Sequence, residues 1–289
     1  MSRLALGTAQ FGLPYGVANN TGQVLRTEAK AMLGLALASG IDTLDTAIAY
    51  GDSEMCLGEI GTQDFKLITK LPLVPNSCAD INAWVLEQIN ASLYRLGVKE
   101  IYGVLLHRSD QFLSSNGAEI HKALQGLKNR GLVKKVGASI YSPAELDALI
   151  PLYQLDLVQV PFNLIDRRLY SSGWLKRLKK IGVEVHTRSA FLQGLLLLKP
   201  DDLPLKFSPW SSLWREWYGW LDTHEISALQ ASLAFPMSFS EIDRVVVGAD
   251  SANQLAQIIT ATSQPFSLNM PNIQCADLNL INPTNWNQL

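Results

Sequence analysis

The chain alternates short apolar runs with amphipathic helical patterns along nearly its whole length. This alternation is the feature that most restricts its fold. Near-continuous apolar runs are typical of strands buried on both faces, as in parallel sheets. Eight parallel strands that alternate with helices in 289 residues predict an α/β protein with a single-domain (β/α)8 TIM barrel. The predicted strands are 4–8, 41–46, 66–70, 101–106, 133–139, 155–160, 183–188 and 244–248.

The segments between these runs carry start and stop signals of helices. Asp80 is a favourable N-cap, and the apolar residues after it repeat with helical spacing until Gly97, which stands where a C-terminal glycine is expected. Thr27, Ser142 and Ser251 predict the starts of three further helices.

A doubly wound open sheet is the alternative arrangement for the same alternation. In that fold a glycine-rich GxGxxG turn normally follows the first strand and holds a dinucleotide phosphate. Residues 7–12 read GTAQFG instead. The sequence therefore favours the closed barrel.

Two segments interrupt the alternation. Residues 262–289 form a polar tail with several prolines, and residues 195–224 form a long insertion after the seventh strand. The insertion holds four of the seven tryptophans, at positions 210, 214, 217 and 220. Two interpretations stay open for it: a surface excursion whose aromatic residues pack on the barrel, or a lid that offers an aromatic platform to substrate.

Composition and charge exclude several classes of function. A net charge of −2 provides no basic surface for nucleic acid or an anionic membrane, and no apolar stretch approaches the ~20 residues that span a bilayer. The N-terminus lacks a signal-peptide layout, and Cys56, Cys78 and Cys275 form no disulfide pattern, so we expect a cytoplasmic protein. The four histidines have no metal-binding spacing, which predicts no metal site.

Polar side chains stand at the ends of three neighbouring predicted strands. Asp45 ends the second strand and Tyr50 follows in its loop, Lys70 ends the third strand, and His107 follows the fourth. Each of them alone could have an ordinary structural role. Barrel enzymes gather their active sites at this end of the strands, however, and a lysine on an inner strand needs a carboxylate partner. We therefore predict one site.

These four residue types suit proton transfer to or from an oxygen atom. A free tyrosine has a pKa near ~10, and a nearby ammonium group favours its phenolate form. Asp45 would keep Lys70 charged, and His107 would orient the oxygen of the substrate. The set contains neither a nucleophile nor an electron source, so a redox reaction would need a bound hydride donor.

Several motifs in matching order resemble those of the aldo-keto reductases over nearly the whole chain. They are GTAQFG (7–12), LDTAIAYG (44–51), ITKL (68–71), LLH (105–107), VGAS (136–139), VQVPFN (158–163), RSAFLQGLL (188–196) and VVVGADSANQL (245–255). The resemblance implies a (β/α)8 barrel that reduces aldehydes and ketones with NADPH, usually in preference to NADH. It implies Tyr50 as general acid, Lys70 and Asp45 as its tuning pair, and His107 as the group that orients the carbonyl.

The resemblance also implies a set of residues that hold the nucleotide along the ends of the strands. Ser139 and Gln159 match the pair that binds the carboxamide, although Ile140 replaces the usual asparagine. Arg188 replaces the aromatic residue that often stacks on the nicotinamide, so it either stacks there or contacts substrate. The remaining cofactor positions are Gly7, Thr8, Asp45, Ser189, Phe191, Gln193, Gly194, Gly248, Ala249, Asp250 and Gln254.

The positions that meet the adenosine ribose depart from the family pattern. Many members hold the 2′-phosphate with lysine or arginine, whereas this chain has Gly248 and Gln254 there, with Asp250 beside them. An acidic residue more naturally meets a free 2′-hydroxyl. The resemblance still favours NADP, with NAD as the alternative.

Two other functions fit parts of the sequence. The substitutions at Ile140, Arg188 and Gln254 are compatible with a nucleotide-binding regulatory or accessory protein on the same fold. In a different barrel enzyme, such as an aldolase, Lys70 would form a Schiff base. The complete set of four polar residues and the order of the motifs favour the reductase.

Overall fold

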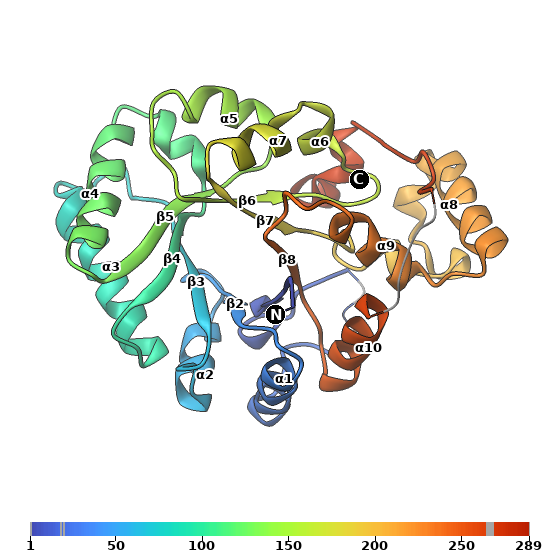
Figure 1. The fold of residues 1–289 in the computed structure, drawn as a ribbon, viewed down its shortest axis with the longest axis horizontal. Coiled ribbons are helices and arrows are strands. Elements are labelled where there is room, and N and C mark those ends of the chain that lie inside the picture. Colours follow the sequence, from blue (N-terminus) through green and yellow to red (C-terminus); the bar gives the residue numbers. More distant parts are fainter. Residues whose placement is uncertain (1, 18, 20, 264–268, 289) are drawn as a thin grey trace.

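The computed structural model describes residues 2–17, 19, 21–263 and 269–288 and forms one closed barrel (Figure 1). Neighbouring strands pair in parallel in chain order, and β1 also pairs with β8, which closes the ring. The single-domain (β/α)8 prediction is confirmed. The strands are β1 (Leu4–Gly7), β2 (Thr43–Asp45), β3 (Lys66–Leu71), β4 (Ile101–Leu106), β5 (Val133–Ser139), β6 (Leu157–Pro161), β7 (Glu184–Arg188) and β8 (Arg244–Val247).

Helices surround the barrel in Figure 1. They are α1 (Arg26–Ala38), α2 (Ser53–Ile60), α3 (Ile81–Leu96), α4 (Gly117–Asn129), α5 (Pro143–Leu149), α6 (Arg168–Ser171), α7 (Trp174–Lys180), α8 (Ser211–His224), α9 (Ala228–Met237), α10 (Ala252–Thr262) and α11 (Leu278–Ile281). Several of these helices begin or end at the capping residues that the sequence predicted. The Asp80 side chain accepts a hydrogen bond from the backbone of α3, and Gly97 ends that helix with a φ of 67°.

The start of α1 differs from the prediction. Ser142 and Ser251 cap α5 and α10 through their side chains, as expected. Thr27, however, lies inside α1, which begins at Arg26 after Leu25 and has no side-chain cap. The N-cap is Leu25, in the β region, so the helix starts two residues earlier than a cap at Thr27 would place it.

Apolar side chains fill the space between strands and helices, and a second small cluster lies inside the barrel. Ile68, Leu105 and Leu157 form this inner cluster and are fully buried. Burial stabilises each by about 1.5–3 kcal/mol. The strands approach closely here: a Cβ on Gly137 would lie 1.6 Å from the backbone oxygen of Leu157, so only glycine fits.

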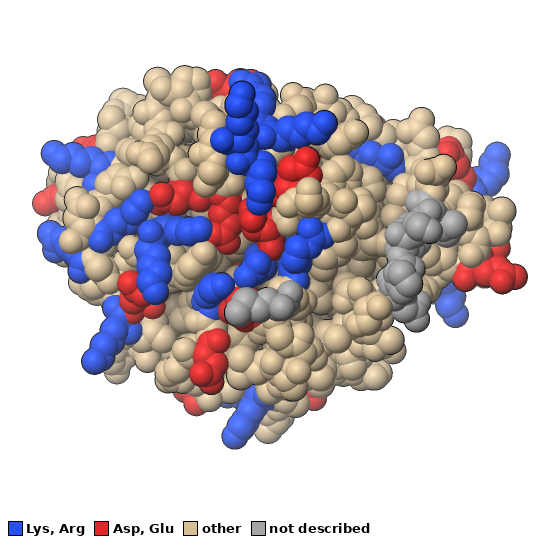
Figure 2. Space-filling view, viewed as in Figure 1, with Lys and Arg blue, Asp and Glu red and all other residues tan. Residues whose placement is uncertain are grey.

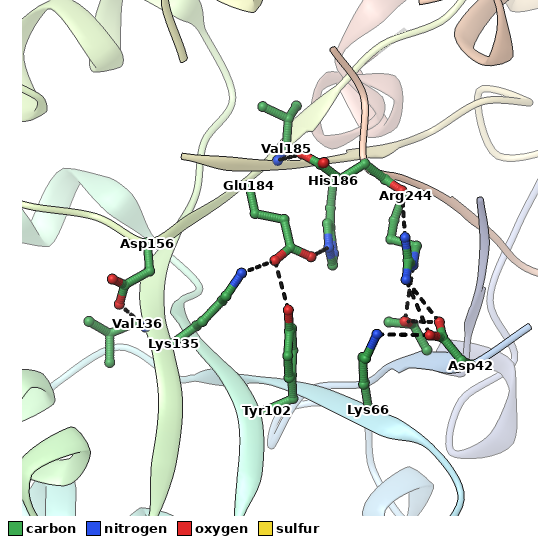
Figure 3. Close-up of polar contacts among 12 residues, drawn as sticks. Asp42, Lys66, Tyr102, Lys135, Val136, Asp156, Glu184, Val185, His186 and Arg244 are labelled. Atoms are coloured by element: carbon green, nitrogen blue, oxygen red, sulfur yellow. Dashed lines mark hydrogen bonds and ion pairs between the residues drawn. The ribbon is translucent and has the colours of Figure 1, made fainter. Parts of the chain in front are cut away.

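Charged residues close the end of the barrel where the strands begin (Figure 3). Glu184 accepts hydrogen bonds from Tyr102 at 2.9 Å, from Lys135, and from His186 at 2.7 Å. Burial alone would raise the pKa of Glu184, but the bonds from His186 and Lys135 outweigh it and hold the pKa well below its usual range. Lysine, arginine and acidic side chains accordingly gather at the middle of the face seen in Figure 2.

Asp42 holds a second part of this charged end. Lys66 donates to its carboxylate at 2.8 Å, and Arg244 donates at 3.0 Å. Asp42, Lys66 and Arg244 come from the loop before β2 and from the first residues of β3 and β8. These ion pairs connect the amino ends of β2, β3 and β8. The opposite end of the barrel, at the carboxyl ends of the strands, is therefore where a binding site is expected.

The insertion at residues 195–224 lies beside the ring of helices, with α8 at the edge of the molecule (Figure 1). Trp214 and Trp217 are buried, and Trp217 donates to the backbone oxygen of Leu196 at 3.3 Å. Phe207 contacts Trp286 of the tail at 5.0 Å between ring centroids. The insertion therefore packs against the tail, and its role as a lid stays a prediction. No helix in the described ranges is long and apolar enough to cross a membrane.

Candidate active site

A cavity of about 580 Å³ lies at the carboxyl ends of the strands. Its size falls in the ~300–1,000 Å³ range of small-molecule sites. The structure brings every residue that the sequence assigned to catalysis or cofactor binding to the wall of this cavity. They are Gly7, Thr8, Asp45, Tyr50, Lys70, His107, Ser139, Gln159, Arg188, Ser189, Phe191, Gln193, Gly194, Gly248, Ala249, Asp250 and Gln254.

A buried ion pair lies at the floor of the cavity. Lys70 Nζ donates to Asp45 Oδ1 at 2.6 Å and to the Thr46 backbone oxygen at 2.9 Å. Burial alone would lower the pKa of Lys70, but the Asp45 carboxylate and the Tyr50 phenol outweigh it and raise the pKa above its ordinary value. Lys70 therefore stays an ammonium group, and these two bonds leave one of its three N–H donors free.

Tyr50 and His107 stand beside this ion pair. Lys70 Nζ lies 5.1 Å from the centre of the Tyr50 ring, and the Tyr50 and His107 rings contact edge to face with 5.8 Å between centroids. Burial and the positive charge of Lys70 lower the pKa of His107 to about 4. At neutral pH the imidazole is uncharged, so one ring nitrogen can donate a hydrogen bond and the other can accept one.

Gln159, in the middle of β6, is paired with Ser139, the last residue of β5. Gln159 Nε2 donates to Asp45 Oδ2 at 2.6 Å. The bond leaves the side-chain oxygen of Gln159 as an acceptor, while the Ser139 hydroxyl can donate. An acceptor and a donor together suit a carboxamide, which is the role that the sequence predicted for this pair.

The loop after β7 holds a strained backbone along the cavity. Ser189, Leu192 and Gln193 have φ values of 63°, 49° and 54°, a conformation that non-glycine residues seldom adopt. Such strain is concentrated at functional sites, where the surrounding structure maintains it. The family resemblance implied that Ser189 and Gln193 of this loop contact the nucleotide.

Part of the loop after β1, to which the sequence assigned no role, also lines the cavity, through Tyr15 and Asn19. The Val17 backbone donates to the Gln193 backbone oxygen at 3.2 Å, and the Gln193 side chain donates to the Tyr15 hydroxyl at 3.3 Å. Asn19 donates to Asp250 Oδ1 at 3.2 Å. The loop after β1 therefore touches the loops after β7 and β8. The glycine and proline residues in FGLPYG predict a loop but carry no sign of these partners.

Arg188 lies over the Tyr141 ring, with 4.6 Å from its guanidinium carbon to the ring centre, and it donates to the Ile140 backbone oxygen at 3.2 Å. In the described part of the chain no ion pair involves Arg188. Tyr141 also lines the cavity and was missed by the sequence analysis. The two side chains form a flat, positively charged wall.

The insertion reaches the cavity through two leucines and not through its tryptophans. Leu197 and Leu198 of the insertion line the cavity, whereas the described lining contains no tryptophan. No group of three or more metal-ligating side chains occurs among the residues that the structure describes.

Comparison with known proteins places the chain in a family. Residues 3–272 match the model of the Aldo/keto reductase family, so the chain belongs to this family. It is 28% identical over 219 residues to "Oxidoreductase sirO" of Leptosphaeria maculans. The match covers 72% of this chain and 65% of that protein. It is 27% identical over 217 residues to the "NADH-specific methylglyoxal reductase" of Escherichia coli, which covers 68% of this chain and 65% of that protein.

A solved structure supports the same fold. The aldo-keto reductase AKR11C1 of Bacillus halodurans, in its holo form, has a TM-score of 0.73 at 23% identity, with 92% of this chain and 88% of that chain covered. The matched region spans less than two thirds of the length of the curated relatives, 65% in both named cases.

Proposed function

We propose that the protein reduces an aldehyde or ketone to an alcohol with a nicotinamide nucleotide as hydride donor. The observation that carries this proposal is the buried Lys70–Asp45 pair beside Tyr50 and His107 at the floor of a cavity. A nucleotide held in this cavity would supply a hydride to the carbonyl carbon and would be oxidised in the exchange. The π bond of the carbonyl breaks, and its oxygen takes a proton from Tyr50.

Each of the four residues would have a separate part in this proton transfer. Lys70 stays positively charged and favours the phenolate that forms when Tyr50 gives up its proton. Asp45 holds Lys70 in position. Neutral His107 donates a hydrogen bond to the carbonyl oxygen and fixes its place.

The residues along the cavity fit the nucleotide. Ser139 and Gln159 would hold the carboxamide, and Arg188 would lie against the nicotinamide ring. Gly7 and Thr8 would contact the nucleotide from the end of β1, and the strained β7 loop would follow the diphosphate. The family favours NADP, with NAD as the alternative, and both supply the same nicotinamide.

The two alternative functions have less support. A Schiff-base lysine needs a lowered pKa, whereas Asp45 raises the pKa of Lys70. A regulatory nucleotide-binding protein would not need the complete set of four residues. The relative named a methylglyoxal reductase supports a small carbonyl substrate. Three free cysteines support the cytoplasm as the location.

The test is turnover of a panel of aldehydes and ketones by the wild-type protein and by Tyr50→Phe. We expect nucleotide oxidation by the wild type and a loss of about 10²–10⁴-fold in kcat for the variant. The dissociation constant of the nucleotide should change less than about twofold, because the phenol acts on the carbonyl oxygen. Equal turnover by the two proteins would refute the assigned acid.

A further inference from the structure

The end of the cavity between β8 and α10 is short of positive charge. Downstream of Arg244 the sequence contains no lysine, arginine or histidine, so this holds for every residue of the β8 loop, α10 and the tail. The cationic residues on the described cavity wall are Lys70, which pairs with Asp45, and Arg188 on β7. Asp250 contributes a carboxylate to the wall at this end.

The first turn of α10 is already bound to acceptors of the protein itself. Glu28, from the first turn of α1, accepts a hydrogen bond from the Ala252 backbone at 2.6 Å. The Ser251 hydroxyl accepts from the Gln254 backbone at 3.2 Å, and the Gln254 side chain accepts from the Asp250 backbone at 2.8 Å. A helix N-terminus normally attracts anions through such N–H groups. Here the Glu28 carboxylate and the Ser251 hydroxyl occupy two N–H groups of the first turn, and the Gln254 side chain occupies the N–H group of Asp250, just before the N-cap.

Asp250 is positioned to accept hydrogen bonds from a ligand. Asn19 donates to its Oδ1 atom at 3.2 Å, which fixes the carboxylate. An ionised carboxylate can only accept, so it suits a donor such as a sugar hydroxyl. A phosphate group carries about −1.5 to −2 charges at neutral pH and offers acceptors, so it meets repulsion there.

We propose that this site selects NAD(H) over NADP(H), and that Glu28 and Asp250 set the selection. The inference rests on the proposed function, because the adenosine end of the nucleotide must lie between β8 and α10. Asp250 accepts a hydrogen bond from a ribose hydroxyl. Glu28 adds a second negative charge and occupies an N–H group that a 2′-phosphate would need.

The experiment is a calorimetric titration of the full chain with NADH and NADPH. ADP-ribose and 2′-phospho-ADP-ribose are titrated in parallel, because they lack the nicotinamide and report on the adenosine end alone. We expect each 2′-phosphorylated ligand to bind on the order of tenfold or more weakly than its partner, since like charges at a partly buried site repel. Salt should narrow the difference by screening.

Two isosteric variants test the named residues. Glu28→Gln and Asp250→Asn remove a charge while keeping an acceptor for the Ala252 backbone and for Asn19. Each should reduce the ratio of NADPH to NADH dissociation constants severalfold. Glu119→Gln is the matched control, because Glu119 also stands in the first turn of a helix, α4, and is exposed. It should leave the ratio unchanged. Melting temperatures confirm that each variant is folded.

The outcomes separate the two proposals. Equal or tighter binding of NADPH would overturn the selection while leaving the proposed reductase in place. A preference for NADH that neither variant alters would overturn the roles of Glu28 and Asp250. If the folded chain binds none of the four ligands, the proposed function itself fails, and the selection fails with it.

Discussion

Gln159 Nε2 donates a hydrogen bond to Asp45 Oδ2 at 2.6 Å, across the barrel from β6 to β2. The other oxygen of Asp45 accepts from Lys70 at 2.6 Å. Both carboxylate oxygens are therefore held, by an amide on one side and an ammonium group on the other. The bond connects the Asp45–Lys70 ion pair to β6, the strand that carries Gln159.

This relationship predicts a large cost for Asp45→Asn. The variant leaves the Lys70 ammonium group buried without a counter-charge, which typically destabilises a protein by about 3–5 kcal/mol. Urea unfolding followed by tryptophan fluorescence measures the change. Gln159→Met is the comparison, because it removes a neutral donor and keeps the ion pair, and it should cost about half as much. A cost below about 1 kcal/mol for Asp45→Asn would contradict a stabilising role of the pair.

His107 predicts a dependence of stability on pH. Its pKa is about 4 in the folded protein, below the ordinary value of 6.5. Between these values the unfolded chain binds more protons at this residue than the folded chain does, so stability falls as the pH is lowered from 6.5 to about 4 and levels off below. The loss approaches roughly 3 kcal/mol.

His107→Gln lacks this contribution. The free energies of unfolding of wild type and variant are measured by urea titration at several pH values. The wild type should lose its advantage over the variant as the pH falls through the window, while the other histidines give both proteins a common background. Parallel curves for the two proteins would show that the pKa of His107 is not depressed.

The hydrogen bonds of Glu184 predict that its replacement lowers the free energy of unfolding, at the end of the barrel away from the cavity. Glu184→Gln removes the carboxylate charge to which His186 and Lys135 donate at the other end of the barrel, and should cost about 1.5–3 kcal/mol through the weakened hydrogen bonds. Because the folded pKa of Glu184 is depressed, its contribution is present above the ordinary carboxyl pKa and is lost as the pH falls through the folded value. Thermal and urea unfolding at neutral pH measure the change.

Glu100 provides the control for this prediction. It pairs with Lys134, which neighbours Lys135 on β5, but both side chains of this pair are exposed. Exposed pairs contribute little, so Glu100→Gln should leave the unfolding midpoint unchanged. If the two glutamate variants lose the same stability, burial is not what gives the Glu184 network its strength.

The position of Arg188 predicts that its replacement weakens binding of the intact nucleotide more than binding of ADP-ribose. If its guanidinium group lies on the nicotinamide ring, Arg188→Met should raise the dissociation constant of the reduced nucleotide severalfold, since a planar cation stacks on flat rings. ADP-ribose lacks that ring, so its affinity should stay within about twofold. An unchanged nucleotide affinity with a raised KM for the carbonyl compound would instead assign Arg188 to the substrate.

Much of the candidate site could be predicted because its polar residues stand at the carboxyl ends of the strands or just after them. Asp45, Lys70 and His107 stand at the ends of β2, β3 and β4 or directly after them, and parallel strands bring their carboxyl ends together. The periodicity of apolar residues predicted all eight strands to within about two residues. The N-caps at Asp80 and Ser142 could also be predicted, because an N-cap side chain accepts a hydrogen bond from a backbone N–H group only two or three residues away.

Contacts between distant loops were decided only by the tertiary structure. The sequence around Glu28 gives no sign that its carboxylate reaches Ala252, nor does Asn19 point to Asp250. The tryptophans of the insertion could have faced substrate, but Trp217 is buried. Propensities and caps act over a few residues and are recorded in the local sequence. The partners of a loop depend on how the closed barrel places its eight strand ends, which no short stretch of sequence contains.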